Sequence, residues 1–311
     1  MNYKNIAVIG SNGFMGSHLT KKLIQVPGIN LFLFGRNESS VFGDSIPYTK
    51  IDLTNKEQVN RCFADIDLVY YLASTSIPAT SWDKPAMEIE QNLLPFINFM
   101  ECLGTLKAKK VVFVSSAGTI YGPSEQKVTE DSFKNPFSPH GITKLAMEYF
   151  LNYFRVRYNI NSDIYRVSNV YGEGQDITKG IGIINTFLEN IIAHNRLNIF
   201  GDGKNVRNYL YVNDCSELLS LSLFTDPSKS EIYNVSSNDT LSINDLVEII
   251  RDIIEEDFEV IYTAARKSDN SVIYLDNSKI LKANPGFKLT GIKEGILQTY
   301  RHIKSRAATM V

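Results

Sequence analysis

Short apolar runs alternate with longer stretches of helical periodicity along the first half of the chain. Runs typical of buried strands lie at 5–9, 31–34, 48–51, 68–72, 111–115 and 162–166. Between them, apolar residues recur at helical spacing around 14–25, 55–64, 84–104 and 140–158. Because such alternation is typical of a parallel sheet covered on both faces, we predict an α/β fold with a Rossmann-type, doubly wound parallel sheet.

The first strand run ends in three glycines at intervals of three residues, Gly10, Gly13 and Gly16. Gly10 allows a tight turn, Gly13 lets the backbone approach a ligand, and Gly16 lets the following helix pack closely on the sheet. The free N–H groups and positive dipole end of that helix would then face a phosphate. A strand before the glycines and a helical pattern after them favour a dinucleotide site over a flexible turn. The residues expected to contact the cofactor here are Gly10, Asn12, Gly13, Phe14, Met15 and Gly16.

The strand and helix alternation ends at about residue 170, where glycine-rich turns and shorter elements follow. We therefore expect residues 1–168 to form the dinucleotide-binding domain, with segments of 207–236 returning to it. Residues 169–311 are expected to form mainly a smaller C-terminal substrate-binding lobe.

Composition and charge narrow the functional classes. The chain has 311 residues, of which 43% are hydrophobic, so it can bury a large core. A net charge of -2 gives no reason to expect a nucleic-acid or membrane partner. The three cysteines, Cys62, Cys102 and Cys215, are widely spaced and indicate neither a disulfide framework nor a metal cluster. The N-terminal apolar run is too short for a signal sequence or membrane span, so we expect a cytoplasmic protein.

A second group of motifs lies in the middle of the chain. Hydroxyl residues follow the run at 111–115 in Ser115-Ser116-Ala117-Gly118-Thr119-Ile120-Tyr121-Gly122, and Ser138-Pro-His140-Gly-Ile-Thr-Lys144 comes later. Asp52-Leu53, Leu72-Ala73 and Arg166-Val-Ser-Asn169-Val-Tyr171-Gly172 complete the set. With the three glycines, these motifs resemble the extended short-chain dehydrogenase/reductase family, especially its nucleotide-sugar epimerases and dehydratases of the UDP-glucose 4-epimerase type. The resemblance extends nearly from end to end.

The resemblance implies roles for residues that match the family motifs. The glycines would hold the cofactor pyrophosphate, Asp52, followed by Leu53, would lie at the adenine, and Leu72 and Ala73 would lie beside the cofactor. Lys144 matches the family lysine that binds the nicotinamide ribose and lowers the pKa of a tyrosine four residues earlier.

That tyrosine is replaced by His140. In the family the tyrosinate removes a proton from a sugar hydroxyl while the same carbon loses a hydride. A neutral imidazole, with an ordinary pKa of ~6.5, can exchange protons near neutrality, although its reach differs from that of a phenol. Three interpretations stay open, namely a working base, an inactive natural homologue and a substitution that disables the enzyme. We expect impaired activity on a scaffold that evolved for catalysis.

The predicted site also departs from the family pattern at its hydroxyl residue. Ala117 occupies the position at which the family often has the catalytic serine or threonine. Ser116 and Thr119 are the neighbouring candidates, although both residue types also cap strands and form turns. We expect Thr119 to contact the substrate and Ser116 to support it.

The choice of cofactor depends on the residues after the second strand, Gly35-Arg36. An acidic residue there would bind the ribose hydroxyls of NAD and repel a 2′-phosphate, so Arg36 leans towards NADP. A solvated Arg36, or one stacked on the adenine, is the alternative, and NAD and NADP both stay open.

The resemblance implies a nucleoside diphosphate sugar as the substrate, of the UDP-hexose or UDP-N-acetylhexosamine type. Arginine suits diphosphate binding because its planar fork makes charge-assisted hydrogen bonds to phosphate oxygens. The expected substrate contacts are Ser81, Lys84, Thr119, Asn169, Arg207 and Arg266.

The predicted function is an NAD(P)-dependent epimerase that acts at C4 of the sugar through a transient 4-keto intermediate, with a place in polysaccharide biosynthesis. The alternatives are an NADPH-dependent reductase of a nucleotide-linked 4-keto sugar and a non-catalytic nucleotide-sugar or dinucleotide-binding homologue. The helix predicted at 140–158 carries apolar and aromatic side chains around much of its circumference, more than the sheet alone would cover. The resemblance implies that this helix pairs with its counterpart in a second copy across a two-fold axis. We therefore expect a homodimer.

Overall fold

The computed structural model describes residues 2–106, 108–254, 257–264 and 272–309 of the chain. The chain divides into two compact units. The first unit comprises 1–120, 134–167 and 216–233, and the second comprises 121–133, 168–215 and 234–311.

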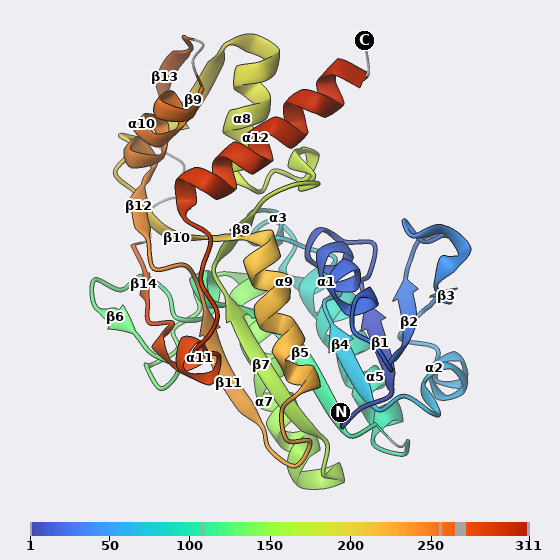
Figure 1. Ribbon diagram of the computed structural model, residues 1–311. Helices are drawn as coiled ribbons and strands as arrows, with labels where there is room; N and C mark the ends of the chain where they lie inside the picture. Colours follow the sequence, from blue (N-terminus) through green and yellow to red (C-terminus); the bar gives the residue numbers. More distant parts are fainter. Residues whose placement is uncertain (1, 107, 255–256, 265–271, 310–311) are drawn as a thin grey trace. The chain divides into compact units, whose positions relative to one another are not determined.

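A seven-stranded sheet forms the centre of the first unit, in the order β11-β7-β5-β4-β1-β2-β3 (Figure 1). The pairings of β1, β2, β3, β4, β5 and β7 are all parallel. The strands are β1 Asn5–Ile9, β2 Asn30–Gly35, β3 Tyr48–Lys50, β4 Leu68–Tyr71, β5 Lys110–Ser116, β7 Asn161–Val167 and β11 Glu231–Val235. The chain runs outward from β1 to β3 and then returns to β4 on the other side of β1. The carboxyl ends of β1 and β4 therefore meet where the strand order reverses, the place at which open α/β sheets bind their ligands.

Aromatic residues fill the core on one face of this sheet. The helices that cover this face are α2 Lys56–Phe63, α5 Leu94–Leu103 and α7 Pro139–Tyr158. The Phe63 ring stacks on Phe34 with 4.5 Å between centroids and meets Phe99 edge to face at 5.0 Å. Such aromatic pairs add to the stabilisation from burial of their apolar area.

Helices α1 Phe14–Ile24 and α9 Val212–Ser220 lie on the opposite face (Figure 1). Lys22 of α1 forms an ion pair with Glu217 of α9. Leu19 and Leu23 of α1 are fully buried. Because both faces are covered, the central strands β1, β4 and β5 are buried at every residue except Asn5 and Ser116, which explains their continuous apolar runs.

Local sequence signals fix where the helices of the first unit begin and end. The Asn55 side chain accepts a hydrogen bond from the Gln58 backbone N–H at 3.0 Å and caps α2. Ser138 caps α7 in the same way through the N–H of Gly141, and Asn159 ends α7 in the left-handed conformation, with φ of 57°. Cap residues supply partners for backbone groups that a helix end leaves free.

An ion pair is buried at the amino-terminal end of the sheet. Lys110 of β5 and Asp163 of β7 are both inaccessible to solvent, and their Nζ and Oδ1 atoms lie 2.8 Å apart. Ser222 and Thr225 donate further hydrogen bonds to Asp163 Oδ2, and Thr225 Oγ1 also accepts one from Lys110. A buried charge needs such partners because it has lost its hydration.

The described part of the second unit contains short sheets and several helices. Its three-stranded sheet has the order β12-β10-β8, and two parallel pairs, β13 with β9 and β14 with β6, accompany it. The strands are β6 Lys127–Val128, β8 Asn169–Tyr171, β9 Arg196–Phe200, β10 Val206–Tyr211, β12 Thr240–Ser242, β13 Glu259–Thr263 and β14 Tyr274–Leu275. The helices are α8 Ile183–His194, α10 Ile243–Ile253, α11 Ser278–Ala283 and α12 Ile292–Thr309.

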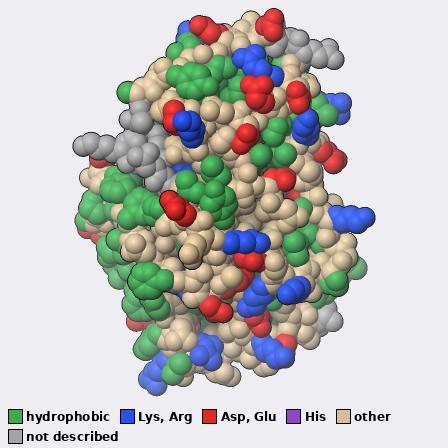
Figure 2. Space-filling view, turned by 90° about the vertical axis from the view of Figure 1, so that its left-hand side faces the viewer, with side chains coloured by type: hydrophobic (Ala, Val, Ile, Leu, Met, Phe, Trp, Pro, Cys, Tyr) green, Lys and Arg blue, Asp and Glu red, His purple; other side chains and the backbone are tan. Residues whose placement is uncertain are grey.

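The predicted fold class is confirmed, since a parallel, doubly wound sheet is present. Each of the six predicted strands is present with its ends shifted by no more than one residue. Residues 121–133 were predicted within the first domain but group with the second unit, because β6 pairs with β14 there. On the face shown in Figure 2, basic and acidic side chains are interspersed, in keeping with a net charge of -2.

Candidate active site

The glycine loop after β1 lies against the chain that follows β4. Gly10 has a φ of +87°, a backbone conformation that other residues rarely adopt. A Cβ atom at Gly10 would lie 3.1 Å from both the Leu72 carbonyl carbon and the Ala73 nitrogen. The structure therefore brings the glycine motif into direct contact with the Leu72-Ala73 pair.

Helix α1 begins against this loop with its N-terminal N–H groups available for an anion. A Cβ atom at Gly16 would lie 2.1 Å from the Gly10 oxygen, so only glycine permits this close approach. The helix starts at Gly13 without a side-chain cap and without an acidic residue in its first turn. Phe14 and Met15 are its first two residues. This loop and helix end have the form that binds a pyrophosphate, so the residues present fit a dinucleotide.

The end of β2 and the loop after it lie against the glycine loop. The Gly10 N–H donates to the Phe34 oxygen at 2.8 Å, which joins the glycine loop to the end of β2. The Asn12 side chain donates to the Ser39 oxygen at 2.8 Å and accepts from the Val41 N–H at 3.1 Å. Asn12 therefore positions the loop that contains Arg36, whose own side chain is exposed.

Asp52 lies just beyond β3. Its Oδ1 atom accepts hydrogen bonds from the N–H and the hydroxyl of Thr54, at 2.9 and 2.7 Å. Its neighbour Leu53 packs against the aromatic core as a partly buried residue. Asp52 thus fixes the turn into α2 in addition to any contact it makes with a ligand.

His140 and Lys144 lie one turn apart on α7, and both are largely buried, with 7% and 8% of their surfaces exposed. Residues four apart share one face of a helix. The Lys144 ammonium donates to the Val114 oxygen at 2.9 Å and lies 4.9 Å from the centre of the Phe113 ring. Lys144 therefore reaches the carboxyl end of β5, next to Ser116.

Burial and charge determine the protonation of this pair. Burial, followed by the positive charge of Lys144, lowers the pKa of His140 to about 3. Burial also lowers the pKa of Lys144, to about 8, although Glu88 and Glu148 oppose this change. The imidazole is therefore neutral near pH 7.

The hydroxyl candidates lie beside the first turn of α7. A Cβ atom at Gly141 would lie 2.4 Å from the Thr119 oxygen, so α7 packs closely on the short helix α6 Ala117–Ile120. The Thr119 hydroxyl donates to the Ser116 oxygen at 3.3 Å. The structure thus gathers Ser116, Thr119, His140 and Lys144 into one region of the first unit.

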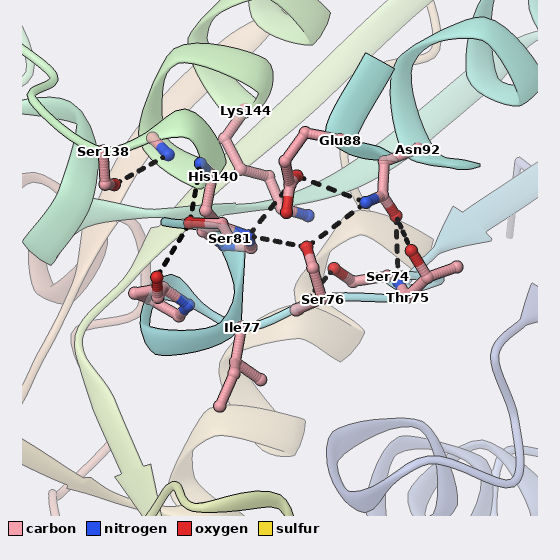
Figure 3. Close-up of polar contacts among 12 residues, drawn as sticks. Ser74, Thr75, Ser76, Ile77, Ser81, Glu88, Asn92, Ser138, His140 and Lys144 are labelled. Carbon is pink, nitrogen blue, oxygen red and sulfur yellow. Dashed lines mark hydrogen bonds and ion pairs between the residues drawn. The ribbon is translucent and has the colours of Figure 1, made fainter. Parts of the chain in front are cut away.

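A polar cluster surrounds the His140 side chain (Figure 3). Ser76 Oγ lies 3.3 Å from Nδ1 of the imidazole, and Glu88 Oε2 lies 4.0 Å from the same nitrogen. Glu88 ends α4 Pro85–Glu88, and the π-helical turn Ile89–Leu93 that follows carries Asn92. The sequence motifs did not identify Glu88 or Ser76. Glu88 lies four residues before Asn92, so helical periodicity was the available signal that both side chains share a face.

The remaining substrate candidates are separated along the chain. The Ser81 hydroxyl is buried and donates to the Pro78 oxygen at 2.7 Å. It also accepts from the backbone N–H of His140 at 3.3 Å, so it holds the start of α7. Lys84 is exposed and precedes α4. In the second unit, Asn169 and Arg207 lie on the paired strands β8 and β10. Arg266 lies outside the described residues.

Within the described ranges, no group of three or more His, Cys, Asp or Glu side chains is placed to hold a metal ion. In the same part of the chain, no helix combines the length and apolar character needed to cross a membrane.

Comparisons with known proteins agree with this geometry. The sequence profile of the NAD dependent epimerase/dehydratase family matches residues 6–236. The chain is 32% identical to a putative UDP-glucose 4-epimerase of Methanocaldococcus jannaschii, over 98% of this chain and 100% of that protein. It is similar to the Thermotoga maritima UDP-glucose 4-epimerase solved with UDP-glucose, with a TM-score of 0.90, 28% identity and coverage of 97% of this chain and 99% of that one. A Thermus thermophilus UDP-glucose 4-epimerase solved with NAD gives a TM-score of 0.87, 27% identity and coverage of 96% and 99%.

Proposed function

The chain belongs to the NAD dependent epimerase/dehydratase family, and from this premise we propose that it is an NAD-dependent 4-epimerase of a UDP-linked hexose or N-acetylhexosamine. The proposal rests on one observation: the first unit holds both a candidate dinucleotide loop and a candidate acid/base pair. A dinucleotide loop lies at the reversal point of the sheet, and the buried pair of His140 and Lys144 lies at the carboxyl end of β5.

The glycine loop supports a role in holding NAD. Gly10, Gly13 and Gly16 shape the turn that presents the start of α1, at Phe14 and Met15, to the pyrophosphate, and Leu72 and Ala73 lie against Gly10 at the edge of this site. Bound NAD supplies the capacity to accept a hydride from sugar C4 and return it to the opposite face of the 4-keto sugar. Lys144 binds the nicotinamide ribose and places a positive charge beside the reacting hydroxyl.

His140 takes the proton of the C4 hydroxyl in this proposal. Its neutral ring has a free lone pair, as a general base requires. Its lowered pKa makes it a weaker base than an ordinary imidazole, so the proposed activity is slow. Thr119 hydrogen-bonds the sugar oxygen, and Ser116 supports it from the end of β5.

NAD is the proposed cofactor because the family and its NAD-bound member use it. Arg36 is exposed after β2, where it can pair with a 2′-phosphate, so NADP remains the competitor. Calorimetry with both dinucleotides decides between them, and Arg36→Asp should weaken only NADP binding. Weaker binding of NAD than of NADP to the unaltered protein would contradict the choice of NAD.

The nucleotide-sugar contacts are proposed residue by residue. Asn169 and Arg207 lie on neighbouring strands and supply donors for the diphosphate, with Arg266 as a further candidate. Lys84 is proposed to contact the sugar nucleotide from the loop before α4. The Ser81 hydroxyl already has two backbone partners, so its proposed contribution is to hold His140 in place.

The test is an NMR assay of the anomeric protons of UDP-glucose, UDP-galactose and their N-acetyl counterparts, with NAD at one tenth of the sugar concentration. Interconversion without net cofactor consumption supports the epimerase. The variant H140Y should turn over faster, because a phenol paired with Lys144 restores the family's acid/base pair. Consumption of NADPH with a 4-keto sugar would identify a reductase instead, and tight binding without turnover in either form would identify a binding protein.

We also propose a homodimer formed through α7. Ile142, Tyr149, Tyr153 and Val156 are exposed by 52%, 66%, 51% and 75% and recur along one side of this helix. An exposed apolar stripe of this kind is typical of a surface that another apolar surface covers.

A further inference from the structure

The replacement of the family tyrosine by His140 creates a charge problem beside Lys144. A tyrosinate next to a lysine is an anion beside a cation. An imidazole that accepts a proton becomes a cation, and the charge of Lys144 already opposes this change. His140 therefore needs a nearby negative charge if it is to work as a base.

Glu88 is placed to supply that charge. Its side chain is 3% exposed, and Oε2 lies 4.0 Å from His140 Nδ1. Its other oxygen, Oε1, has no hydrogen-bond partner among the described residues. A buried carboxylate oxygen without a partner is costly, so a functional reason for its position is expected.

Asn92 fixes the orientation of the cluster (Figure 3). Its Oδ1 atom accepts from the Thr75 backbone N–H at 2.8 Å, and a backbone N–H can only donate. The Asn92 Nδ2 group must therefore point the other way, where it donates to Glu88 Oε2 and Ser76 Oγ, both at 3.2 Å. These two bonds hold the Glu88 carboxylate oxygen, which can only accept, and the Ser76 hydroxyl, which can accept or donate, beside the imidazole.

This arrangement selects one form of the histidine ring. The Glu88 carboxylate on the Nδ1 side favours the tautomer that carries its proton on Nδ1, and the Ser76 hydroxyl can accept from that N–H while it also accepts from Asn92. Nε2 then keeps the lone pair that can accept a proton from a substrate. The charged groups that face the ring are Glu88 from the end of α4 and Lys144 from α7, with Glu148 acting on Lys144.

We infer that Glu88 is a positioning residue for His140, and that the two form a histidine–carboxylate pair which replaces the single tyrosine of the family. When the sugar hydroxyl gives its proton to Nε2, the O–H bond breaks and an N–H bond forms. The Nδ1 proton stays between the ring and the Glu88 and Ser76 oxygens. The proton returns from Nε2 to the sugar oxygen at the end of the cycle, so the pair ends in its starting state.

The inference rests on the proposed function, and a double-mutant comparison tests it. Glu88→Gln keeps the size of the side chain and one acceptor oxygen for Asn92 but removes the charge. We expect it to lower kcat by about a hundredfold, in the range of a general base that loses its support, with KM changed by less than about threefold. In the H140Y background the same change should lower kcat by less than about threefold, because a tyrosinate needs no carboxylate. The matched control is Glu90→Gln, an exposed residue two positions along the same helical segment.

If Glu88→Gln lowered kcat equally in the His140 and H140Y backgrounds, Glu88 would act only on the fold. An unchanged kcat for Glu88→Gln in the protein that keeps His140 would also overturn the inference. A second readout does not depend on turnover. Long-range ¹H–¹⁵N NMR of the NAD-bound, ¹⁵N-histidine protein reports the tautomer, and the signal absent from H140Y assigns His140. We expect the Nδ1–H form, lost or mixed in Glu88→Gln, whereas an Nε2–H form in the unaltered protein would refute the pairing. Inactivity of every variant together with the Nδ1–H form would refute the epimerase and support the pairing.

Discussion

Replacement of Gly16 by alanine gives the most direct test of the cofactor loop. The new Cβ atom would lie 2.1 Å from the Gly10 oxygen and 2.9 Å from the Gly10 carbonyl carbon. Ordinary contacts between such atoms begin at roughly 3.5 Å, so α1 and the loop must separate by about 1.4 Å. The backbone N–H groups proposed to face the pyrophosphate would move with them.

Two terms of opposite sign set the effect on stability. Overpacking costs about 1–3 kcal/mol, and alanine in place of glycine within a helix returns about 1 kcal/mol. The net loss in the free energy of unfolding is therefore about 0–2 kcal/mol. Binding depends more steeply on geometry, because a site must hold its groups within about 0.5 Å. We expect the affinity for NAD to fall by at least about tenfold.

Urea denaturation and calorimetric titration with NAD measure the two effects of Gly16→Ala separately. Gly286→Ala is the matched control, because a Cβ atom there meets nothing within 4 Å. The control should bind NAD as the unaltered protein does. If Gly16→Ala bound NAD within twofold of the unaltered protein, the close approach of α1 would not serve the cofactor, and the reasoning would be refuted.

Three further predictions concern the core, the site and the surface. Lys110→Met should lower the free energy of unfolding by about 3–5 kcal/mol in urea denaturation, because Asp163 would keep a buried charge without its ion-pair partner. The double variant with Asp163→Leu should recover much of this loss. A double variant as unstable as Lys110→Met would contradict the prediction. Burial lowers the pKa of Lys144 from 10.5 to about 8, so the unfolded chain binds more protons between these values and stability from this group rises with pH there. The free energy of unfolding relative to Lys144→Met should therefore rise by about 3 kcal/mol from pH 8 to pH 10.5, and a flat difference would argue against the shifted pKa. Val156→Asp should convert the proposed dimer to a monomer in sedimentation at micromolar concentration, and a monomeric mass for the unaltered protein would refute the dimer.

The sheet could be predicted from the sequence because its physical signals are local. Buried strands of a parallel sheet require continuous apolar runs, and the glycines between β1 and α1 are required by backbone geometry within a few residues. The ends of α7 were also readable, since Ser138 and Pro139 form a standard helix start.

The polar cluster around His140 could not be predicted in the same way. Ser76 lies 64 residues from His140 in the sequence, and only the packed fold brings the two side chains together. The lowered pKa values of His140 and Lys144 also depend on burial by distant segments, which spacing does not reveal. The roles of Asn12 and Ser81 in holding loops and helix starts likewise depend on partners that are remote in sequence.

We propose that this chain inverts C4 of a UDP-sugar and returns the same hydrogen to that carbon. The most direct measurement uses UDP-glucose deuterated at C4, incubated with the unaltered protein and H140Y and substoichiometric NAD in ordinary water, followed by NMR and mass spectrometry. We expect UDP-galactose that retains the deuterium at C4, with the faster reaction in H140Y. Formation of UDP-galactose with the deuterium lost to solvent, or no UDP-galactose from either form, would contradict it.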